Sequence, residues 1–170
     1  MNEAYTRGQK VLHWLLAVLL LFWLFVSGEL VEEAQGDDKG FILMFHSGGA
    51  IVIGMLMAFR FYLRRKHPVV VMGSLKDWEK VWSQRIHVAF YVFVALMVLS
   101  GIVQGMFFEQ DVRVFGLINI TLGHNESLMG IFHLVHGASA NVLKVLILLH
   151  ILAALKHQFI DKQAMLKRMA

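Results

Sequence analysis

The sequence predicts an all-α integral membrane protein, folded as a four-helix up-and-down bundle with both termini in the cytoplasm. Three observations support this prediction. First, 58% of the 170 residues are hydrophobic and only 16% are charged, whereas about a quarter of the residues of a soluble domain are charged. Second, the apolar residues form four long runs. Third, the basic residues gather on connections that would share one side of a membrane. Residues 1–170 are therefore expected to form a single membrane domain.

Each apolar run is long enough to cross a bilayer, which takes about 17 to 25 residues in a helix. The predicted transmembrane helices lie at about residues 11–28, 41–63, 86–108 and 128–155. No small-residue cleavage site follows the first run, so we expect it to be retained. Asn125 is a predicted N-cap of the fourth helix. Ser74 and Asp77 have the spacing of a capping box and predict a helix start before the third run.

The distribution of lysine and arginine predicts the orientation. Of the 16 basic residues, Lys39 and Arg113 lie in the connections after the first and third runs, and Lys144 lies within the fourth run. The other 13 lie at the N-terminus, in the 60–85 region or in the C-terminal tail. Because basic residues mark the cytoplasmic side, both termini and the 60–85 region are expected inside. The pI of about 9.5 then reflects topology and anionic lipid, not nucleic acid.

Cysteine is absent, which excludes disulfides, c-type haem attachment and iron–sulfur or zinc sites built on cysteine. There is no glycine-rich phosphate loop and no dinucleotide-binding fingerprint. The nine histidines are the remaining candidates for chemistry. Several of them fall within the apolar runs, where an ionisable residue is rare and usually functional.

The fourth helix carries three histidines on one face. His150 lies 14 residues after His136, within about 40° of the same face and about 21 Å further along the helix. His157 lies within about 20° of His150, whereas His133 lies about 100° away. Two ligands so far apart on one helix cannot bind one ion, but they can serve two cofactors at two depths.

The first and second helices each supply a partner at one of these depths. His13 lies near the inner end of the first helix, at the depth of His150, and His46 lies near the outer end of the second, at the depth of His136. One histidine from each of two helices at each depth is what axial ligation of two haem irons requires. Zinc or copper would need three or four ligands at one depth.

Neighbouring residues fit this hypothesis. Small residues flank the outer pair, in HSGGA at 46–50 and HGASA at 136–140, and would let a porphyrin approach the backbone. Arg60, toward the inner end of the second helix, could bind a propionate of the inner haem or extend to lipid phosphate. Membrane histidines can also form hydrogen bonds between helices, and for His87 alone that role is favoured.

Four stretches, spread over nearly the whole chain, resemble the bacterial cytochrome b561 family of four-helix, di-haem, quinone-linked membrane cytochromes. They are HW at 13–14, FHSGGAIVIGMLMAFR at 45–60, RIHVAFY at 85–91 and LLHILAALKHQFIDKQAMLKRM at 148–169. The resemblance implies haem ligation by His13, His46, His136 and His150. It also implies location in the bacterial inner membrane and ubiquinone as a partner. Lys144 is not expected from it.

The predicted function is electron transfer across or within the inner membrane through two b-type haems, to or from ubiquinone. Bis-histidine ligation leaves no open iron position, which disfavours direct oxygen binding. Quinone reduction consumes protons, and an imidazole titrates near neutral pH. His157 and His87, both near the inner face, are therefore candidate quinone-binding or proton-relay residues, with structural hydrogen bonding as the alternative. A soluble electron donor is a further expected partner.

Three other functions stay open from the sequence. The chain could be the cytochrome b anchor of a larger dehydrogenase or hydrogenase complex. It could be a superoxide-oxidising quinone reductase, although the acidic connection after the first helix would repel an anion. A haem-free proton carrier is least favoured, because the apolar runs contain no Asp or Glu. The sequence does not decide between an enzyme and an electron carrier, nor does it give the direction of electron flow.

Overall fold

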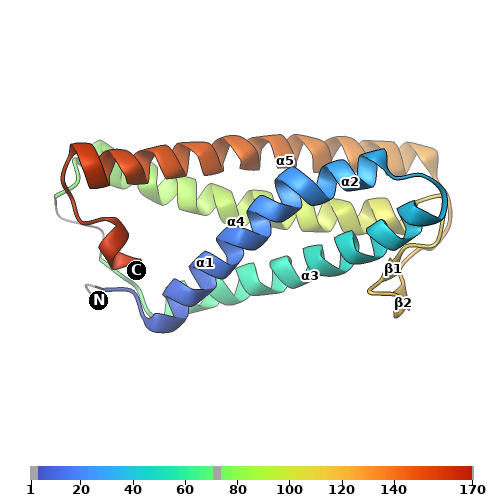
Figure 1. Cartoon of the computed structure of the whole chain (residues 1–170), viewed down its shortest axis with the longest axis horizontal. Coiled ribbons are helices and arrows are strands. Elements are labelled where there is room, and N and C mark those ends of the chain that lie inside the picture. Colours follow the sequence, from blue (N-terminus) through green and yellow to red (C-terminus); the bar gives the residue numbers. More distant parts are fainter. Residues whose placement is uncertain (1–3, 71–73, 170) are drawn as a thin grey trace.

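The computed structural model describes residues 4–70 and 74–169 and shows four long helical segments that run side by side in alternating directions (Figure 1). The first segment is composite: α1 (Arg7–Phe22) continues through a π-helical turn, η1 (Trp23–Ser27), into α2 (Gly28–Glu33). The others are α3 (Gly36–Lys66), α4 (Asp77–Met106) and α5 (Glu126–Leu155), the last extended by a second π-helical turn, η2 (Lys156–Ile160). A short 3-10 helix, η3 (Leu166–Arg168), lies near the C-terminus.

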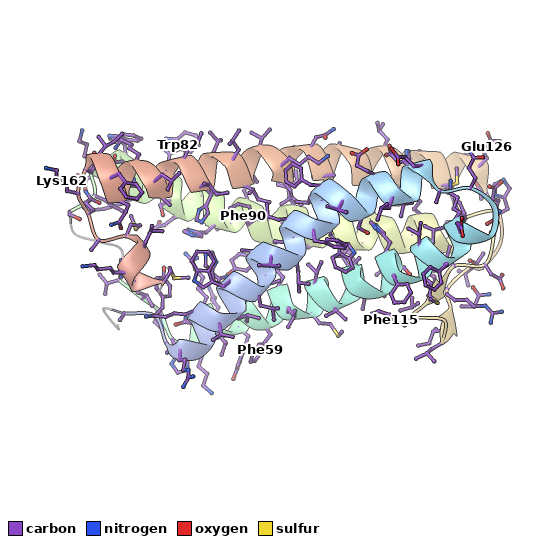
Figure 2. All side chains as sticks on the ribbon, in the orientation of Figure 1. Phe59, Trp82, Phe90, Phe115, Glu126 and Lys162 are labelled. Carbon is purple, nitrogen blue, oxygen red and sulfur yellow. The ribbon has the colours of Figure 1, made fainter. Side chains whose placement is uncertain are left out.

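This architecture confirms the predicted fold class. Within the described residues, four helical segments are long and apolar enough to cross a membrane. Large apolar side chains are exposed along all four of them, and they cover the outside of the bundle (Figure 2). Such a surface suits lipid, because a soluble protein rarely exposes extended apolar patches.

The two ends of the bundle differ. Both termini, the end of α3 and the start of α4 lie at one end, hereafter the terminal end (Figure 1). The turn from α2 to α3 and the connection from α4 to α5 lie at the other, hereafter the hairpin end. That the terminal end faces the cytoplasm remains a prediction from the basic residues.

A small β-hairpin, which the sequence analysis did not anticipate, forms part of the connection from α4 to α5. Strands β1 (Arg113–Val114) and β2 (Ile118–Asn119) pair antiparallel. Between them, Phe115 has a φ of 48°, a left-handed conformation that is uncommon for a residue other than glycine. The backbone N–H of Phe115 donates to the carbonyl of Met44 at 3.3 Å. The hairpin is therefore anchored on α3.

Two predicted helix starts have different outcomes. Asn125 caps α5 as predicted, since its side chain accepts a hydrogen bond from the backbone N–H of Leu128 at 3.0 Å. The prediction that a helix starts at Ser74 is wrong, because α4 begins only after Lys76. Glu79 accepts a hydrogen bond from the backbone N–H of Lys76 at 3.0 Å. This acidic side chain of the first turn satisfies a backbone donor that the helix leaves open.

A buried apolar layer fills the middle of the bundle. Its members come from all four helical segments: Leu12, Leu16, Leu24, Ile53, Met57, Val94 and Leu143. Leu143 is 0% exposed. It lies midway along α5 between His136 and His150, so the layer separates the two depths at which histidines were predicted to pair.

Candidate functional site

At the hairpin end, the structure brings His46 of α3 and His136 of α5 together. The centres of the two imidazole rings are 6.2 Å apart and their planes cross at 63°. Imidazole nitrogens bind metals at about 2 Å and the ring centre lies about 1 Å behind the nitrogen, so two imidazoles on opposite sides of one metal have centres about 6 Å apart. The pair therefore fits bis-histidine ligation of a haem.

Hydrogen bonds orient both rings of this pair. Ser27 Oγ lies 2.8 Å from Nδ1 of His46, and the carbonyl of Met97 lies 2.9 Å from Nδ1 of His136. Gly101 of α4 makes room for the His136 ring, because a Cβ there would lie 3.0 Å from the ring. With Nδ1 engaged, Nε2 of each ring is the nitrogen that remains for a metal. Ligating histidines usually donate their other N–H to a fixed acceptor in this way.

The glycines that follow His46 accommodate aromatic side chains. A Cβ on Gly48 would lie 2.6 Å from the ring of Phe115, and a Cβ on Gly49 would overlap the indole of Trp23. From the sequence, these glycines were expected to let a porphyrin approach the backbone. In the structure, the ring of Phe115 from the hairpin packs on Gly48, and the indole of Trp23 from η1 packs on Gly49.

At the terminal end, three histidine rings gather. The predicted pair, His13 of α1 and His150 of α5, have ring centres 6.2 Å apart and planes that cross at 75°. The centre of the His87 ring on α4 is 5.8 Å from that of His150. By distance alone, either His13 or His87 could therefore share a metal with His150. Nδ1 of His87 is buried and makes no hydrogen bond of good geometry among residues 4–70 and 74–169, although the backbone of Ser83 lies within reach of the ring.

Arg60 lies at the same level as these three rings. Its Nη1 donates to the backbone carbonyl of Gln9 at 3.1 Å, so the side chain turns into the bundle toward α1. Its positive charge acts on both His13 and His150. A guanidinium whose charge reaches both candidate ligands suits the binding of a propionate carboxylate. Of the two roles expected for Arg60, this position favours the propionate over lipid phosphate.

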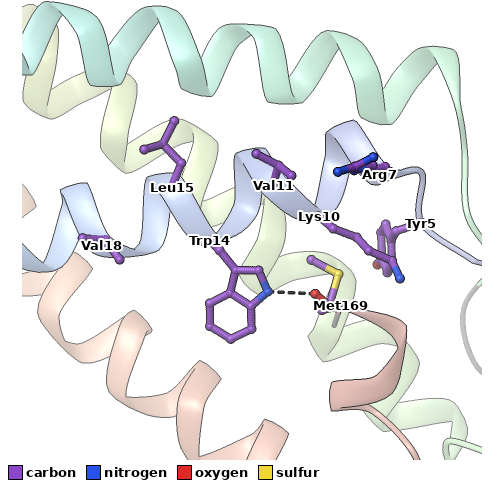
Figure 3. A pocket seen from close by; sticks show the side chains of 8 residues that line it. All are labelled: Tyr5, Arg7, Lys10, Val11, Trp14, Leu15, Val18 and Met169. Atoms are coloured by element: carbon purple, nitrogen blue, oxygen red, sulfur yellow. Dashed lines mark hydrogen bonds between the residues drawn. The ribbon is translucent and has the colours of Figure 1, made fainter.

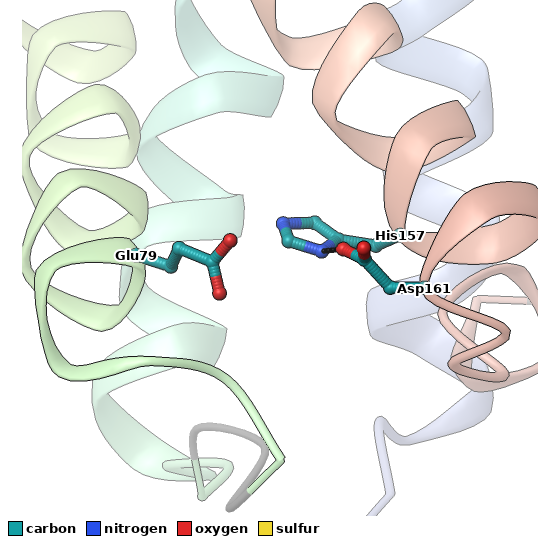
Figure 4. Close-up of side chains that lie close together, drawn as sticks. All are labelled: Glu79, His157 and Asp161. Carbon is teal, nitrogen blue, oxygen red and sulfur yellow. Dashed lines mark hydrogen bonds and ion pairs between the residues drawn. The ribbon is translucent and has the colours of Figure 1, made fainter.

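His157 lies in η2 within a cluster of ion pairs (Figure 4). Nδ1 of His157 and Nζ of Lys156 each lie 2.7 Å from Oδ2 of Asp161. Lys156 also reaches Oε1 of Glu79 at 3.2 Å, which ties η2 to α4. The pKa of Asp161 lies below its ordinary value, chiefly because Lys156 donates a hydrogen bond to the carboxylate, with a further hydrogen bond from His157.

In the part of the chain that the structure describes, Glu79, His157 and Asp161 are the one group that could offer three ligands to a metal ion. The ammonium group of Lys156 already forms ion pairs with both carboxylates, at 3.2 and 2.7 Å. A metal cation at this place would be repelled by the ammonium group. We therefore interpret the cluster as a set of internal ion pairs that fixes the ring of His157, whose side chain is 11% exposed.

Two further polar residues of α5 have partners outside the histidine pairs. The Lys144 ammonium lies 5.5 Å from the centre of the Phe25 ring, a cation–π arrangement that the sequence did not suggest. Nδ1 of His133 lies 3.2 Å from Nε2 of Gln104 on α4. His133 is thus an exposed contact between helices, and it lies off the face that His136 and His150 share.

A surface groove of about 910 Å³ lies along α1 at the terminal end (Figure 3). One face of α1 forms an apolar wall, with Arg7 and Lys10 toward one end, and Met169 from the C-terminal segment closes one side. Trp14 lines the groove and donates from Nε1 to the carbonyl of Met169 at 2.7 Å. The Trp14 ring centre is 5.3 Å from that of His13. Sequence reasoning missed this groove because it forms only when the C-terminal segment folds back on α1.

Four apolar helices with histidine pairs between them at two depths define a helical membrane protein of the cytochrome type. The family model of prokaryotic cytochrome b561 matches residues 4–170. The chain therefore belongs to this family of membrane electron-transfer proteins, which implies binding of haem b. The resemblance seen in the sequence is confirmed. A comparison with individual curated proteins found no match.

Proposed function

We propose that the chain is a di-haem b-type cytochrome that carries electrons across the bacterial inner membrane and exchanges them with ubiquinone. His46 and His136 would hold one haem, and His13 and His150 the other. The observation that supports this most directly is the equal spacing of the two pairs, with ring centres 6.2 Å apart in both. Bound haem b supplies reversible one-electron chemistry.

The apolar layer between the pairs favours electron transfer over proton transport. Proton transfer needs a chain of hydrogen-bonding groups, and the buried side chains of Ile53, Val94 and Leu143 offer none. Electrons do not need such a chain. A haem-free relay of histidines would have to bridge about 21 Å along α5 through this layer.

The haem content of histidine variants tests the ligand assignment. The purified protein, produced with ample haem, should show two b haems per chain in the reduced-minus-oxidised spectrum and the pyridine haemochrome assay. His46→Ala, His136→Ala, His13→Ala and His150→Ala should each retain about one. His133→Ala is the matched control on α5, because its ring contacts Gln104 instead of a second histidine; it should retain two.

The same assay decides between the two candidate partners of His150. His87→Ala should retain both haems if His13 is the ligand, whereas loss of one haem in His87→Ala but not in His13→Ala would reassign the pair. A wild-type chain without haem would refute the proposal altogether. An equal loss in His133→Ala would show that haem loss reports general damage to α5 instead of ligation.

For the quinone, we propose that His157 exchanges a proton with a quinone oxygen at the terminal end. Asp161 holds Nδ1 of His157, which leaves Nε2 for the exchange. The Asp161 side chain is 27% exposed, so it connects the ring to water. His87 is a second candidate for proton transfer, because it lies beside His150. The groove at Trp14 is a second candidate place for the quinone itself, because Trp14 contacts the ring of His13.

Stopped-flow reduction of the haems by a short-chain ubiquinol separates these sites. His157→Gln should slow haem reduction by about a hundredfold or more, the low end of what loss of a positioned acid–base group costs. Trp14→Leu should leave the rate near that of the wild type, and His124→Gln, in a loop at the hairpin end, is the control. Slow reduction in Trp14→Leu with normal reduction in His157→Gln would place the quinone in the groove.

The proposed sites would serve an independent quinone oxidoreductase, including a superoxide-oxidising one, or the cytochrome b anchor of a larger dehydrogenase or hydrogenase. Copurification with a soluble redox subunit would identify the anchor. Reduction of both haems by superoxide, with transfer of the electrons to added quinone, would identify the superoxide-oxidising enzyme.

A further inference from the structure

We propose that Ser27 is a positioning residue for His46 and that the π-helical turn η1 exists to present it. The inference rests on the proposed ligation of a haem by His46. Ser27 is the last residue of η1, and its Oγ lies 2.8 Å from Nδ1 of His46. The side chain comes from a different helical segment than the ring it contacts, so it acts across the interface between η1 and α3.

The burial of Ser27 shows that this contact is specific. Ser27 is 6% exposed, and a buried hydroxyl needs a hydrogen-bond partner. Among the residues that the structure describes, the partner of the Ser27 hydroxyl is the His46 ring. Ser47, the residue after His46, differs in this respect, because its hydroxyl donates to the carbonyl of Met44 in its own helix at 3.2 Å.

The π-helical turn places two side chains on His46 at once. Trp23, the first residue of η1, donates from Nε1 to the backbone carbonyl of His46 at 3.1 Å, and Ser27 reaches the ring. A π-helical turn holds one residue more than an α-helical turn, and such turns recur at functional sites. The buried Gly49 lets the Trp23 indole lie directly on α3. Residues of η1 therefore form hydrogen bonds with both the backbone and the ring of His46.

The hydrogen bond sets the state of the His46 ring. When Nε2 faces a metal, Nδ1 carries the proton and donates a hydrogen bond to Ser27 Oγ. This hydrogen bond fixes the tautomer and the ring orientation and makes the imidazole a more basic ligand. A more basic axial ligand favours oxidised iron and lowers the midpoint potential. His136 differs, because its Nδ1 is bonded to the carbonyl of Met97 at 2.9 Å, with Ser100 Oγ further off at 3.4 Å.

Redox titration and EPR spectroscopy of Ser27→Ala test this inference. The midpoint potential of one haem should rise and its low-spin EPR signal should shift, while the other haem stays unchanged as an internal reference. Ser27→Thr, which keeps the hydroxyl, should restore both readouts. Ser47→Ala is the matched control, and Ser100→Ala should have a smaller effect than Ser27→Ala because Met97 still holds His136. Selective loss of one haem in Ser27→Ala, restored in Ser27→Thr, would support the same role.

Other results would overturn the inference. If Ser27→Ala matches Ser47→Ala in both potentials and in the EPR spectrum, Ser27 does not position a ligand. If Ser27→Thr behaves like Ser27→Ala, packing and not the hydroxyl is responsible. These outcomes are distinct from a failure of the proposed function, which would appear as absence of haem from the wild-type chain.

Discussion

The substitution Gly49→Ala tests how closely η1 packs on α3. A Cβ at residue 49 would overlap Cζ2 of Trp23 and lie 2.6 and 2.7 Å from two further indole carbons, whereas carbon atoms in contact are about 3.5 to 4 Å apart. The indole would have to move by about 1 Å or more to restore such contacts. That movement would weaken the hydrogen bond from Trp23 Nε1 to the His46 carbonyl, which is 3.1 Å long.

The expected loss of stability follows from these two effects. Overpacking a buried site costs about 1 to 3 kcal/mol, and losing the hydrogen bond costs about 0.5 to 1.5 kcal/mol. Alanine in place of glycine stabilises a helix by up to about 1 kcal/mol. The net loss is therefore about 0.5 to 3.5 kcal/mol. For a chain of this size, that lowers the melting temperature by roughly 1 to 14 °C.

Thermal unfolding in detergent, followed by circular dichroism, measures the change. Gly130→Ala in α5 is the matched control, because a Cβ there would meet nothing within 4 Å, and its melting temperature should be unchanged or slightly higher. In a Trp23→Phe background, Gly49→Ala should be less damaging, since the smaller ring leaves room for the methyl group. If Gly49→Ala melts like Gly130→Ala, the close contact between Trp23 and α3 is refuted.

Three further predictions concern stability and use the same measurement. Leu143→Ala should lose about 2 to 5 kcal/mol, because the side chain is 0% exposed and leaves a cavity in the apolar layer; an unchanged melting temperature would contradict the position of the core. Asn125→Ala should lose about 1 kcal/mol with the cap of α5, and Asn125→Ser should restore most of it. The depressed pKa of Asp161 stabilises the fold above about pH 4, the ordinary value of the group, and this contribution disappears as the pH falls through the depressed value. Asp161→Asn should therefore be less stable than the wild type at pH 7, with a difference that shrinks toward pH 3; a constant difference would contradict the role of the Lys156 hydrogen bond.

The fold and the histidine pairs were predictable because both depend on periodic patterns. Apolar runs of sufficient length identify membrane helices, and helical periodicity places His136 and His150 on one face of α5 at two depths. The alternation of four crossings then assigns His46 and His13 to those depths. The structure brings these same pairs to equal ring-centre distances of 6.2 Å.

Features that depend on contacts between segments were not predictable. The π-helical turn η1 leaves no hydropathy signal, because Trp23–Ser27 reads as ordinary membrane helix. Hydropathy also shows which residues suit lipid, not which accept hydrogen bonds. The hydropathy pattern therefore did not reveal that Glu79, and not Ser74, accepts a hydrogen bond from the backbone at the start of α4. The proximity of His87 to His150 depends on the rotation of α4 about its own axis, which a helix apolar on every face does not reveal.

The two histidine pairs lie in different electrostatic surroundings, and this difference predicts the order of their potentials. Both rings of the hairpin-end pair have Nδ1 bonded to oxygen, by Ser27 and by Met97, which lowers the midpoint potential of a haem held there. The charge of Arg60 acts on both rings of the terminal-end pair, and a nearby positive charge raises the potential by favouring the reduced state. Under the proposed ligation, the haem lost in His136→Ala should thus have the lower midpoint potential of the two. Arg60→Gln should reduce the difference between the two midpoint potentials. Such an order favours electron flow toward the terminal end, where we propose that His157 exchanges protons with a quinone. A higher potential for the hairpin-end haem would reverse this direction.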